Sequence, residues 1–305
     1  MTAATPDLGQ QVAVVTGATG GMGQVIAAGL AQAGAHVIVI ARDPARADAL
    51  RTLIGASAAS RLEVIAADLS RRADVVAAAQ LIVTRHQQIH ILVNNAGAHF
   101  PGHRVSADNV EMHVALDYLA AYGLMTRLDT PLRRGRARIV NVASDTLNDT
   151  RQVKIAGRAR PVDLDLTEAD SLADVNPATG FVPFQAYARA KLMTVTAGYA
   201  LARTLAADGV TVNALHPGIV ATDIIGDLVP APLRPFRTLI RRSLLTPAQG
   251  AATALRLATD PSLAGVTGRY FNRDLETTTP AVSHDLGTQR RLRELSEHHF
   301  AGPRR

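Results

Sequence analysis

Cysteine and tryptophan are absent from this chain of 305 residues, and lysine occurs only twice, at Lys154 and Lys191. Without cysteine there are no disulfides, thiolate metal sites or cysteine nucleophiles. The lack of cysteine fits a reducing compartment, and we expect a cytoplasmic protein. Aromatic residues make up only 4% of the chain, which argues against a stacking platform for single-stranded nucleic acid.

Long apolar runs and targeting signals are also lacking. No segment approaches the run of about 18 apolar residues that is typical of a transmembrane helix. The first residues, MTAATPDLGQ, do not show the basic region and apolar run of a secretory signal. The net charge of +6 comes from dispersed arginines, which indicates a solvated surface and, secondarily, a phosphate-bearing cofactor. We expect no integral membrane segment, no nucleic-acid partner and no metal site.

Short runs rich in Val and Ile alternate with Ala- and Leu-rich stretches of helical length. Most of these runs are continuously apolar, which is typical of strands buried on both faces of a parallel sheet. The expected strands are 12–15, 37–40, 62–66, 89–93, 138–142 and 211–215, and the expected helices are 22–33, 44–54, 72–86, 107–128 and 185–207. This order predicts an α/β fold with a doubly wound parallel sheet of Rossmann type.

A single domain is expected over residues 1–305, because elements of one sheet occur on both sides of every irregular segment. The section 145–184, rich in Asp, Arg, Pro and Gly, is predicted to be an insertion in the form of a long loop or hairpin. We expect flexible ends at 1–9 and 296–305.

A glycine-rich turn follows the first expected strand, in the stretch Thr16-Gly17-Ala18-Thr19-Gly20-Gly21-Met22-Gly23. Glycines allow a tight turn and let backbone N–H groups approach a pyrophosphate, and the helix that follows offers its positive end. The spacing is Gly-x3-Gly-x-Gly, not the dinucleotide fingerprint G-x-G-x-x-G. A strand–helix turn without a ligand is the alternative.

The end of the second expected strand carries Ala41 and Arg42 where an NAD site usually has an acidic residue. An arginine there can pair with a ribose 2′-phosphate, which predicts NADP(H) in preference to NAD(H). A surface arginine without this role is the alternative. Asp43, before Pro44, is predicted to cap the next helix.

Tyr187 and Lys191 are four residues apart within an expected helix, so they share one face. Five tyrosines and two lysines placed at random would give this spacing roughly 0.03 times. A phenol normally titrates near pH 10, and a neighbouring cation favours the phenolate, which makes a tyrosine a usable acid/base. An ordinary surface helix is the alternative.

These motifs, in this order, resemble the short-chain dehydrogenase/reductase superfamily over about residues 10–275. The matching stretches are Thr16–Gly23, Ala67-Asp68-Leu69, Asn94-Asn95-Ala96-Gly97, Ser144, Tyr187-x3-Lys191 and Pro217-Gly218. Glu111-Met112-His113, Val210–Gly218 and Thr246-Pro247 through Tyr270-Phe271 resemble its retinol-dehydrogenase-like branch.

The resemblance implies a role for each matching residue. Ser144 would hold the substrate oxygen, Tyr187 would exchange the proton, and Lys191 would lower the pKa of Tyr187 and bind the nicotinamide ribose. The implied cofactor contacts are Gly17, Thr19, Gly21, Met22, Gly23, Arg42, Asp68, Leu69, Asn95, Ala96, Gly97, Tyr187, Lys191, Pro217, Gly218, Val220 and Thr222. Purely structural roles are the alternative for Asn94, Asn95, Ser144 and Asp68: bridging strand ends or capping a helix.

Two departures from the family pattern stand out. Asp117 occupies the position where related enzymes carry an asparagine of a water-mediated proton relay. It either still binds the relay water or alters the relay, and a one-turn misalignment is the third possibility.

The distance from Ser144 to Tyr187 is 43 residues (187 − 144), longer than in many members. Arg151, Lys154, Arg158 and Arg160 in this insertion either read the substrate or belong to a solvated hairpin, which we favour.

A substrate lid is expected at about 221–246, where Phe236, Leu239, Ile240 and Leu244 fall at helical spacing between arginines. Docking on a membrane surface is the alternative. The N-terminal anchor that retinol enzymes often have is not expected here.

The sequence as a whole predicts an NADP(H)-dependent oxidoreductase that interconverts a carbonyl and an alcohol on an apolar small molecule, for example a biosynthetic tailoring ketoreductase. A homo-oligomer is implied by the resemblance. The alternatives are a nucleotide-binding regulator and an enzyme of redox-neutral isomerisation or cyclisation.

Overall fold

A computed structural model describes residues 7–151, 159–220 and 244–302. One sheet of eight strands forms its centre, in the order β3-β2-β1-β4-β5-β6-β7-β8. All neighbours are parallel except β7 and β8, which are antiparallel. The strands are β1 Val12–Thr16, β2 His36–Ala41, β3 Leu62–Ala66, β4 Ile91–Asn94, β5 Arg138–Val142, β6 Thr211–His216, β7 Tyr270–Asn272 and β8 Leu275–Thr277.

Helices follow most of the parallel strands. They are α1 Gly21–Gln32, α2 Ala47–Ile54, α3 Ala56–Ala59, α4 Arg72–Arg85, α5 Ala120–Arg127, α6 Asp129–Arg134, α7 Pro183–Leu205, α10 Pro247–Thr259 and α11 Leu286–Ala301. The predicted doubly wound parallel sheet is confirmed, and its six expected strands match β1 to β6 within two residues at each end. Among the described residues, no helix combines the length and the apolar character that crossing a bilayer requires.

Each central strand is apolar throughout because it is covered on both faces. In β1, Val14 packs into one hydrophobic cluster, while Ala13 and Val15 pack into the other. Successive side chains of a strand point to opposite faces, so a continuous apolar run supplies both cores. The first cluster includes residues of α4, α5 and α7, and the second includes residues of α1, α2 and α10.

The expected helix at 107–128 begins later than predicted. Ser106 to Val110 form a turn instead, closed by a hydrogen bond from the Ser106 N–H to the Val110 carbonyl, with Asn109 at a φ of 56°. A π-helical segment, Val114–Leu119, then leads directly into α5. π-Helical turns are rare and often mark functional sites, and this one contains Asp117.

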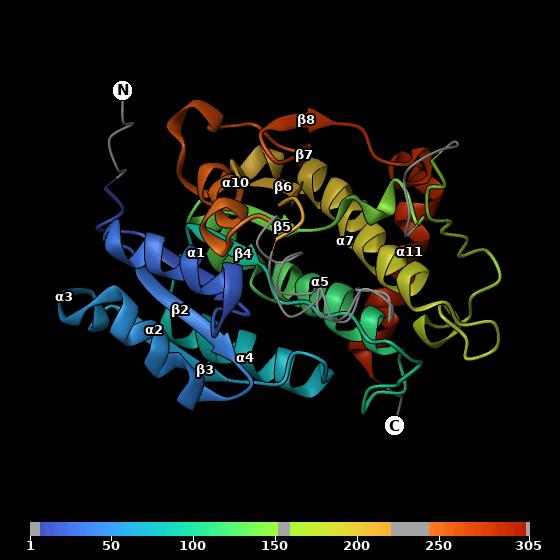
Figure 1. Cartoon of the computed structure of the whole chain (residues 1–305), viewed down its shortest axis with the longest axis horizontal. Coiled ribbons are helices and arrows are strands. Elements are labelled where there is room, and N and C mark those ends of the chain that lie inside the picture. The colour runs from blue at the N-terminus through green and yellow to red at the C-terminus, as the bar shows by residue number, and fades with distance from the viewer. Residues whose placement is uncertain (1–6, 152–158, 221–243, 303–305) are drawn as a thin grey trace.

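The expected flexible C-terminal end is wrong for residues 296–301, which form the last turns of α11. Ser296 and Phe300 are buried there, and the Tyr118 and Ser296 hydroxyls are 2.5 Å apart. At the other end, Leu8 is buried within the expected flexible segment 1–9. Figure 1 shows α11 beside α7, at the end of the chain. Burial of one face of α11 explains why this segment is a packed helix.

The described part of the insertion contains two short 3-10 turns, at Asp145–Leu147 and Leu172–Asp174, and no strand. Its apolar side chains join the main core: Leu147, Val162, Leu164, Leu166, Leu172 and Val175. Arg151 pairs with Asp149 at 2.7 Å, and the Arg160 N–H donates to the same carboxylate. The Asp149 carboxylate therefore holds this part of the insertion together locally. Lys154 and Arg158 lie outside the described residues.

Candidate active site

Most of the predicted site residues gather at the carboxyl edge of the sheet. The glycine-rich turn follows β1, Arg42 follows β2, Asp68 lies two residues after β3, Asn95 follows β4, Ser144 lies two residues after β5 and Pro217 follows β6. Carboxyl ends of parallel strands meet at one edge, and ligands bind where the strand order reverses. The reversal here lies between β1 and β4, which are neighbours in the sheet.

The turn after β1 has the backbone of a phosphate cradle. Gly17 has a φ of +65°, a left-handed conformation that favours glycine. A Cβ on Gly23 would clash with the carbonyl oxygen of Gly17 and the side-chain amide of Asn95. The chain therefore turns tightly and enters α1 at Gly21 with its first N–H groups free of helical partners. This arrangement fits a cofactor pyrophosphate.

The segment after β4 braces this turn. Thr16 Oγ1 accepts hydrogen bonds from the N–H groups of Asn95 and Ala96, at 3.0 and 2.9 Å. The Asn95 side-chain amide donates to the carbonyls of Thr16 and Gly17. Asn95 thus fixes the shape of the cradle, while Asn94 is buried and donates to Asn141 on β5. Both asparagines bridge strand ends.

Arg42 directly follows β2 at the carboxyl edge of the sheet, and it is exposed to solvent. Asp43 accepts a hydrogen bond from the Ala45 N–H, so its predicted capping role is confirmed. Asp68 accepts from the N–H and hydroxyl of Ser70, which gives this side chain a structural partner in the turn before α4.

The segment after β6 lies close to the glycine-rich turn. Gly218 has a φ of +89°, and Val220 is buried. Val220 and Met22 both lie against Gly250 of α10, which joins the segment after β6 to the turn after β1. Thr222 and nearly all of the predicted lid lie outside the described residues.

Tyr187 and Lys191 lie on α7 with their side chains buried, at 7% and 3% residue exposure. The Lys191 ammonium is 5.6 Å from the centroid of the Tyr187 ring. Burial raises the pKa of Tyr187, Lys191 lowers it and Asp117 raises it, while a hydrogen bond with Ser144 lowers it further. Burial dominates, so this pKa lies above its ordinary value. The three predicted catalytic groups Ser144, Tyr187 and Lys191 are therefore brought together.

Asp117 joins this group from the π-helical segment. Its Oδ1 lies 3.1 Å from Lys191 Nζ and accepts a hydrogen bond from the Ala98 N–H. Burial raises the pKa of Asp117 against the opposing charge of Lys191. Burial alone would lower the pKa of Lys191, but Asp117 and Tyr187 outweigh it and raise that pKa. Lys191 also donates to the Val142 carbonyl at 3.2 Å, so the ammonium bridges α7, β5 and Asp117.

The close packing explains the glycine at position 97. A Cβ on Gly97 would clash with Asp117 Oδ1 and would lie 2.8 Å from Lys191 Nζ. Asp117 Oδ2 is buried and has no hydrogen-bond partner among the described residues. Asp117, which was predicted to occupy the relay position, therefore contacts Lys191 directly.

A buried polar network beside Tyr187 was not predicted. Glu111 accepts from His113 Nδ1 and from the Asn176 amide, both at 2.8 Å. His113 Nε2 accepts from the Phe100 N–H, which leaves Nδ1 as the ring atom that faces Glu111. Asn176 in turn accepts from Arg189, two residues after Tyr187. The Glu111-Met112-His113 motif was the only sequence signal for this network.

Two histidine rings flank the phenol. The ring centroids of His99 and His113 both lie 6.0 Å from that of Tyr187, in edge-on orientation. The network therefore joins the insertion, through Asn176, to the side chains that surround Tyr187.

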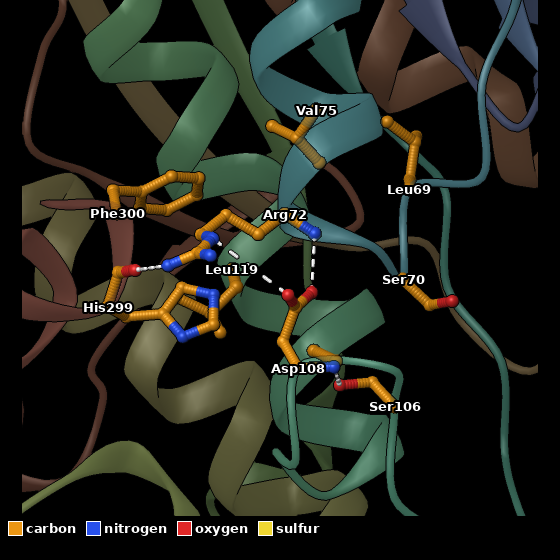
Figure 2. A pocket seen from close by; sticks show the side chains of 10 residues that line it. Leu69, Ser70, Arg72, Val75, Ser106, Asp108, Leu119, His299 and Phe300 are labelled. Carbon is orange, nitrogen blue, oxygen red and sulfur yellow. Dashed lines mark hydrogen bonds and ion pairs between the residues drawn. The ribbon is translucent and has the colours of Figure 1, made fainter. Parts of the chain in front are cut away.

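Figure 2 shows a small pocket around Arg72. Ser144, Tyr187, Lys191 and Asp117 are not among the residues that line it. The Arg72 N–H donates to Asp108, and its guanidinium donates to the His299 carbonyl at 2.8 Å. Of the predicted site residues in the described chain, only Leu69 lines it. The pocket marks where α4, the turn at 106–110 and the end of α11 are joined.

Comparisons with known proteins agree with this geometry. The family profile described as "short chain dehydrogenase" matches residues 11–156. A "Probable oxidoreductase" of Streptomyces antibioticus is 36% identical over 92% of this chain and 90% of its own. Human "Polyprenol dehydrogenase" (94% of this chain, 84% of its own) and "Retinol dehydrogenase 14" (93% and 84%) are each 30% identical.

A solved structure supports the same assignment. A putative NAD(P)-dependent gluconate 5-dehydrogenase of Beutenbergia cavernae, with bound NADP at low occupancy, has a TM-score of 0.63 and 28% identity. The match covers 88% of this chain and 96% of that one. The chain therefore belongs to the short-chain dehydrogenase/reductase superfamily, in its retinol-dehydrogenase-like branch, and is an NAD(P)-dependent oxidoreductase.

Proposed function

We propose that this protein uses NADP(H) to interconvert a carbonyl and an alcohol on an apolar small molecule. The observation that carries this proposal is the buried grouping of Ser144, Tyr187 and Lys191 beside the phosphate cradle after β1. The family resemblance supports the residue roles predicted from the sequence.

The bound nicotinamide would supply or accept the hydride. In the reducing direction the Tyr187 hydroxyl donates its proton to the substrate oxygen as the carbonyl carbon becomes an alcohol carbon. Lys191 stabilises the phenolate that remains, and the Ser144 hydroxyl donates a hydrogen bond to the same substrate oxygen. The oxidising direction runs through the same groups in reverse.

Asp117 is the natural candidate to restore the proton. It contacts Lys191, its pKa is raised by burial, and its Oδ2 has no partner among the described residues. We assign it the relay position that an asparagine holds in related enzymes. A carboxyl group can hold the proton itself, whereas an amide can only orient a water molecule.

NADP(H) preference rests on Arg42. Its guanidinium is exposed after β2, where the cofactor ribose would lie, and Asp43 is engaged as a cap. An arginine pairs with a 2′-phosphate, whereas an acidic residue there would repel it.

An apolar substrate is favoured by the leucine-, isoleucine- and phenylalanine-rich segment predicted as a lid. Two relatives are named for apolar alcohols, polyprenol and retinol. A tailoring ketoreductase, a cytoplasmic location and a homo-oligomeric state remain predictions from the sequence.

The deciding experiment mixes purified protein with NADPH and a panel of apolar ketones and follows the reduced-nicotinamide absorbance. We expect its loss with wild type and its persistence with Tyr187→Phe, which lacks only the phenolic oxygen. Both proteins should still bind NADPH by fluorescence titration, which separates loss of turnover from loss of the cofactor site. Cofactor binding without oxidation across the panel and in the reverse direction would favour a regulator or a redox-neutral enzyme.

A further inference from the structure

A cluster of side chains of the kinds that can bind a metal ion lies at the opposite edge of the sheet from the active site. His36 is the first residue of β2, Glu63 is the second residue of β3, and His86 directly follows α4. Because β2 and β3 are parallel, these positions are at the amino-terminal edge. None of them belongs to the cofactor cleft or to the residues around Tyr187.

The three side chains converge on one point. Glu63 Oε2 lies 2.8 Å from His86 Nε2 and 3.5 Å from His36 Nε2. The two imidazole ring centroids are 5.3 Å apart. One potential ligand atom from each residue lies within 4.8 Å of the other two. Three separate elements thus present two nitrogens and one oxygen to the same small volume.

The surroundings fix the orientation of the Glu63 carboxylate and leave the cluster open to solvent on the side of His36. The side chains of Glu63 and His86 are 17% and 15% exposed, while that of His36 is 38% exposed. The other carboxylate oxygen, Oε1, accepts a hydrogen bond from Arg85. Arg85 can therefore keep the carboxylate oriented while Oε2 binds elsewhere, and water can enter beside His36.

We propose that His36, Glu63 and His86 bind a divalent transition-metal ion of the zinc class, with water as a fourth ligand. Two imidazoles and a carboxylate are a ligand set that suits zinc. Metal–ligand distances of about 2.0–2.2 Å place tetrahedral ligand atoms roughly 3.3–3.6 Å apart. The separation of 3.5 Å between Glu63 and His36 lies in that range, and that of 2.8 Å between Glu63 and His86 is shorter, so small side-chain rotations suffice.

A bound ion would join three elements at the edge of the sheet. β3 pairs only with β2 among the described strands, so it is an edge strand. Linking it to β2 and to the end of α4 would restrain its fraying. A ligand that binds only the folded chain raises the thermal midpoint with concentration.

The test uses the full chain after removal of any affinity tag and treatment with EDTA. Zinc chloride is titrated calorimetrically, and thermal unfolding is followed with and without zinc. We expect one equivalent of zinc to bind and to raise Tm. His36→Gln, Glu63→Gln and His86→Gln should each weaken binding at least about tenfold and remove the Tm shift.

A matched histidine control is His298→Gln, which alters an exposed residue of α11 and should leave zinc binding unchanged. Folding of each variant is checked by its Tm in EDTA. With Cu²⁺ as a probe, electron paramagnetic resonance should show nitrogen coupling from two imidazoles, reduced to one in His36→Gln or His86→Gln. Failure of wild type to bind zinc, or an affinity equal to that of wild type in all three ligand variants, would overturn the proposal without touching the oxidoreductase assignment.

Discussion

The Lys191 ammonium lies 3.1 Å from the Asp117 carboxylate, and both side chains are almost fully buried. Taking two charges out of water is costly, and their attraction offsets this only when the geometry is good. The pair ties the π-helical segment to α7, and the Thr194 hydroxyl reinforces it by donating to the Asp117 carbonyl at 2.8 Å. Lys191 thus has a charged partner where an asparagine would be neutral.

Replacing this partner should shift the pH dependence of turnover. Asp117 contributes to raising the pKa of Tyr187, so Asp117→Asn should lower that pKa. Alcohol oxidation requires the phenolate, so the acidic limb of its kcat/KM profile should move to lower pH. The measurement is a pH series of initial rates with NADP⁺. The control is Asp129→Asn, which alters a partly exposed ion pair on α6 and should keep the wild-type profile. If the acidic limb of the kcat/KM profile did not move in Asp117→Asn, the relay role of Asp117 would be contradicted.

The network behind Tyr187 should have its own pH signature in stability. Burial raises the pKa of Glu111, but hydrogen bonds from His113 and Asn176 lower it below its ordinary value of 4.5. The ionised carboxylate therefore contributes stability above pH 4.5, and this contribution is lost as pH falls through the lower pKa of the folded state. Glu111→Gln should cost about 1–3 kcal/mol in the free energy of unfolding at pH 7.

Urea unfolding at several pH values measures this difference. It should shrink as pH falls below 4.5, because wild type then loses the same interaction. Glu294→Gln on the surface of α11 should stay within about 0.5 kcal/mol of wild type at pH 7. If the loss of unfolding free energy in Glu111→Gln did not vary with pH, the charge of the Glu111 carboxylate would not be its cause.

Cofactor preference should follow Arg42. A hydrogen bond to a charged group contributes about 1.5–3 kcal/mol. Arg42→Ala should therefore raise the Kd of NADPH roughly 10–100-fold and leave that of NADH nearly unchanged. Fluorescence titrations with both cofactors check this. Arg51→Ala, at an exposed pair with Asp48 on α2, is the matched control, and an equal loss for both cofactors would disprove 2′-phosphate recognition.

Two glycines of one turn should respond differently to alanine. Gly23→Ala introduces a Cβ that clashes with Gly17 and Asn95, so cofactor binding should be lost. Gly20→Ala meets nothing within 4 Å, and its φ of −179° suits any residue, so cofactor affinity should be retained. Circular dichroism shows whether each variant is still folded, so that loss of cofactor binding can be told from unfolding. Equal cofactor affinities in the two variants would contradict the role of this turn in binding the pyrophosphate.

The sequence alone determined the layers of the fold, because continuous apolar runs need cover on both faces. It also placed the glycine turn after β1 and Tyr187 and Lys191 on one helix face, since both depend on spacing along one element. It could not show the late helix start near Asn109 or the packed C-terminal helix, where local turn geometry and distant partners decide.

Only the tertiary structure joined residues from separate elements. Asp117 reaches Lys191 across two helical segments, and Asn176 reaches Glu111 from the insertion. His36, Glu63 and His86 meet because two parallel strands and the end of α4 share one edge. Such contacts depend on how elements pack in space, and no local spacing encodes them.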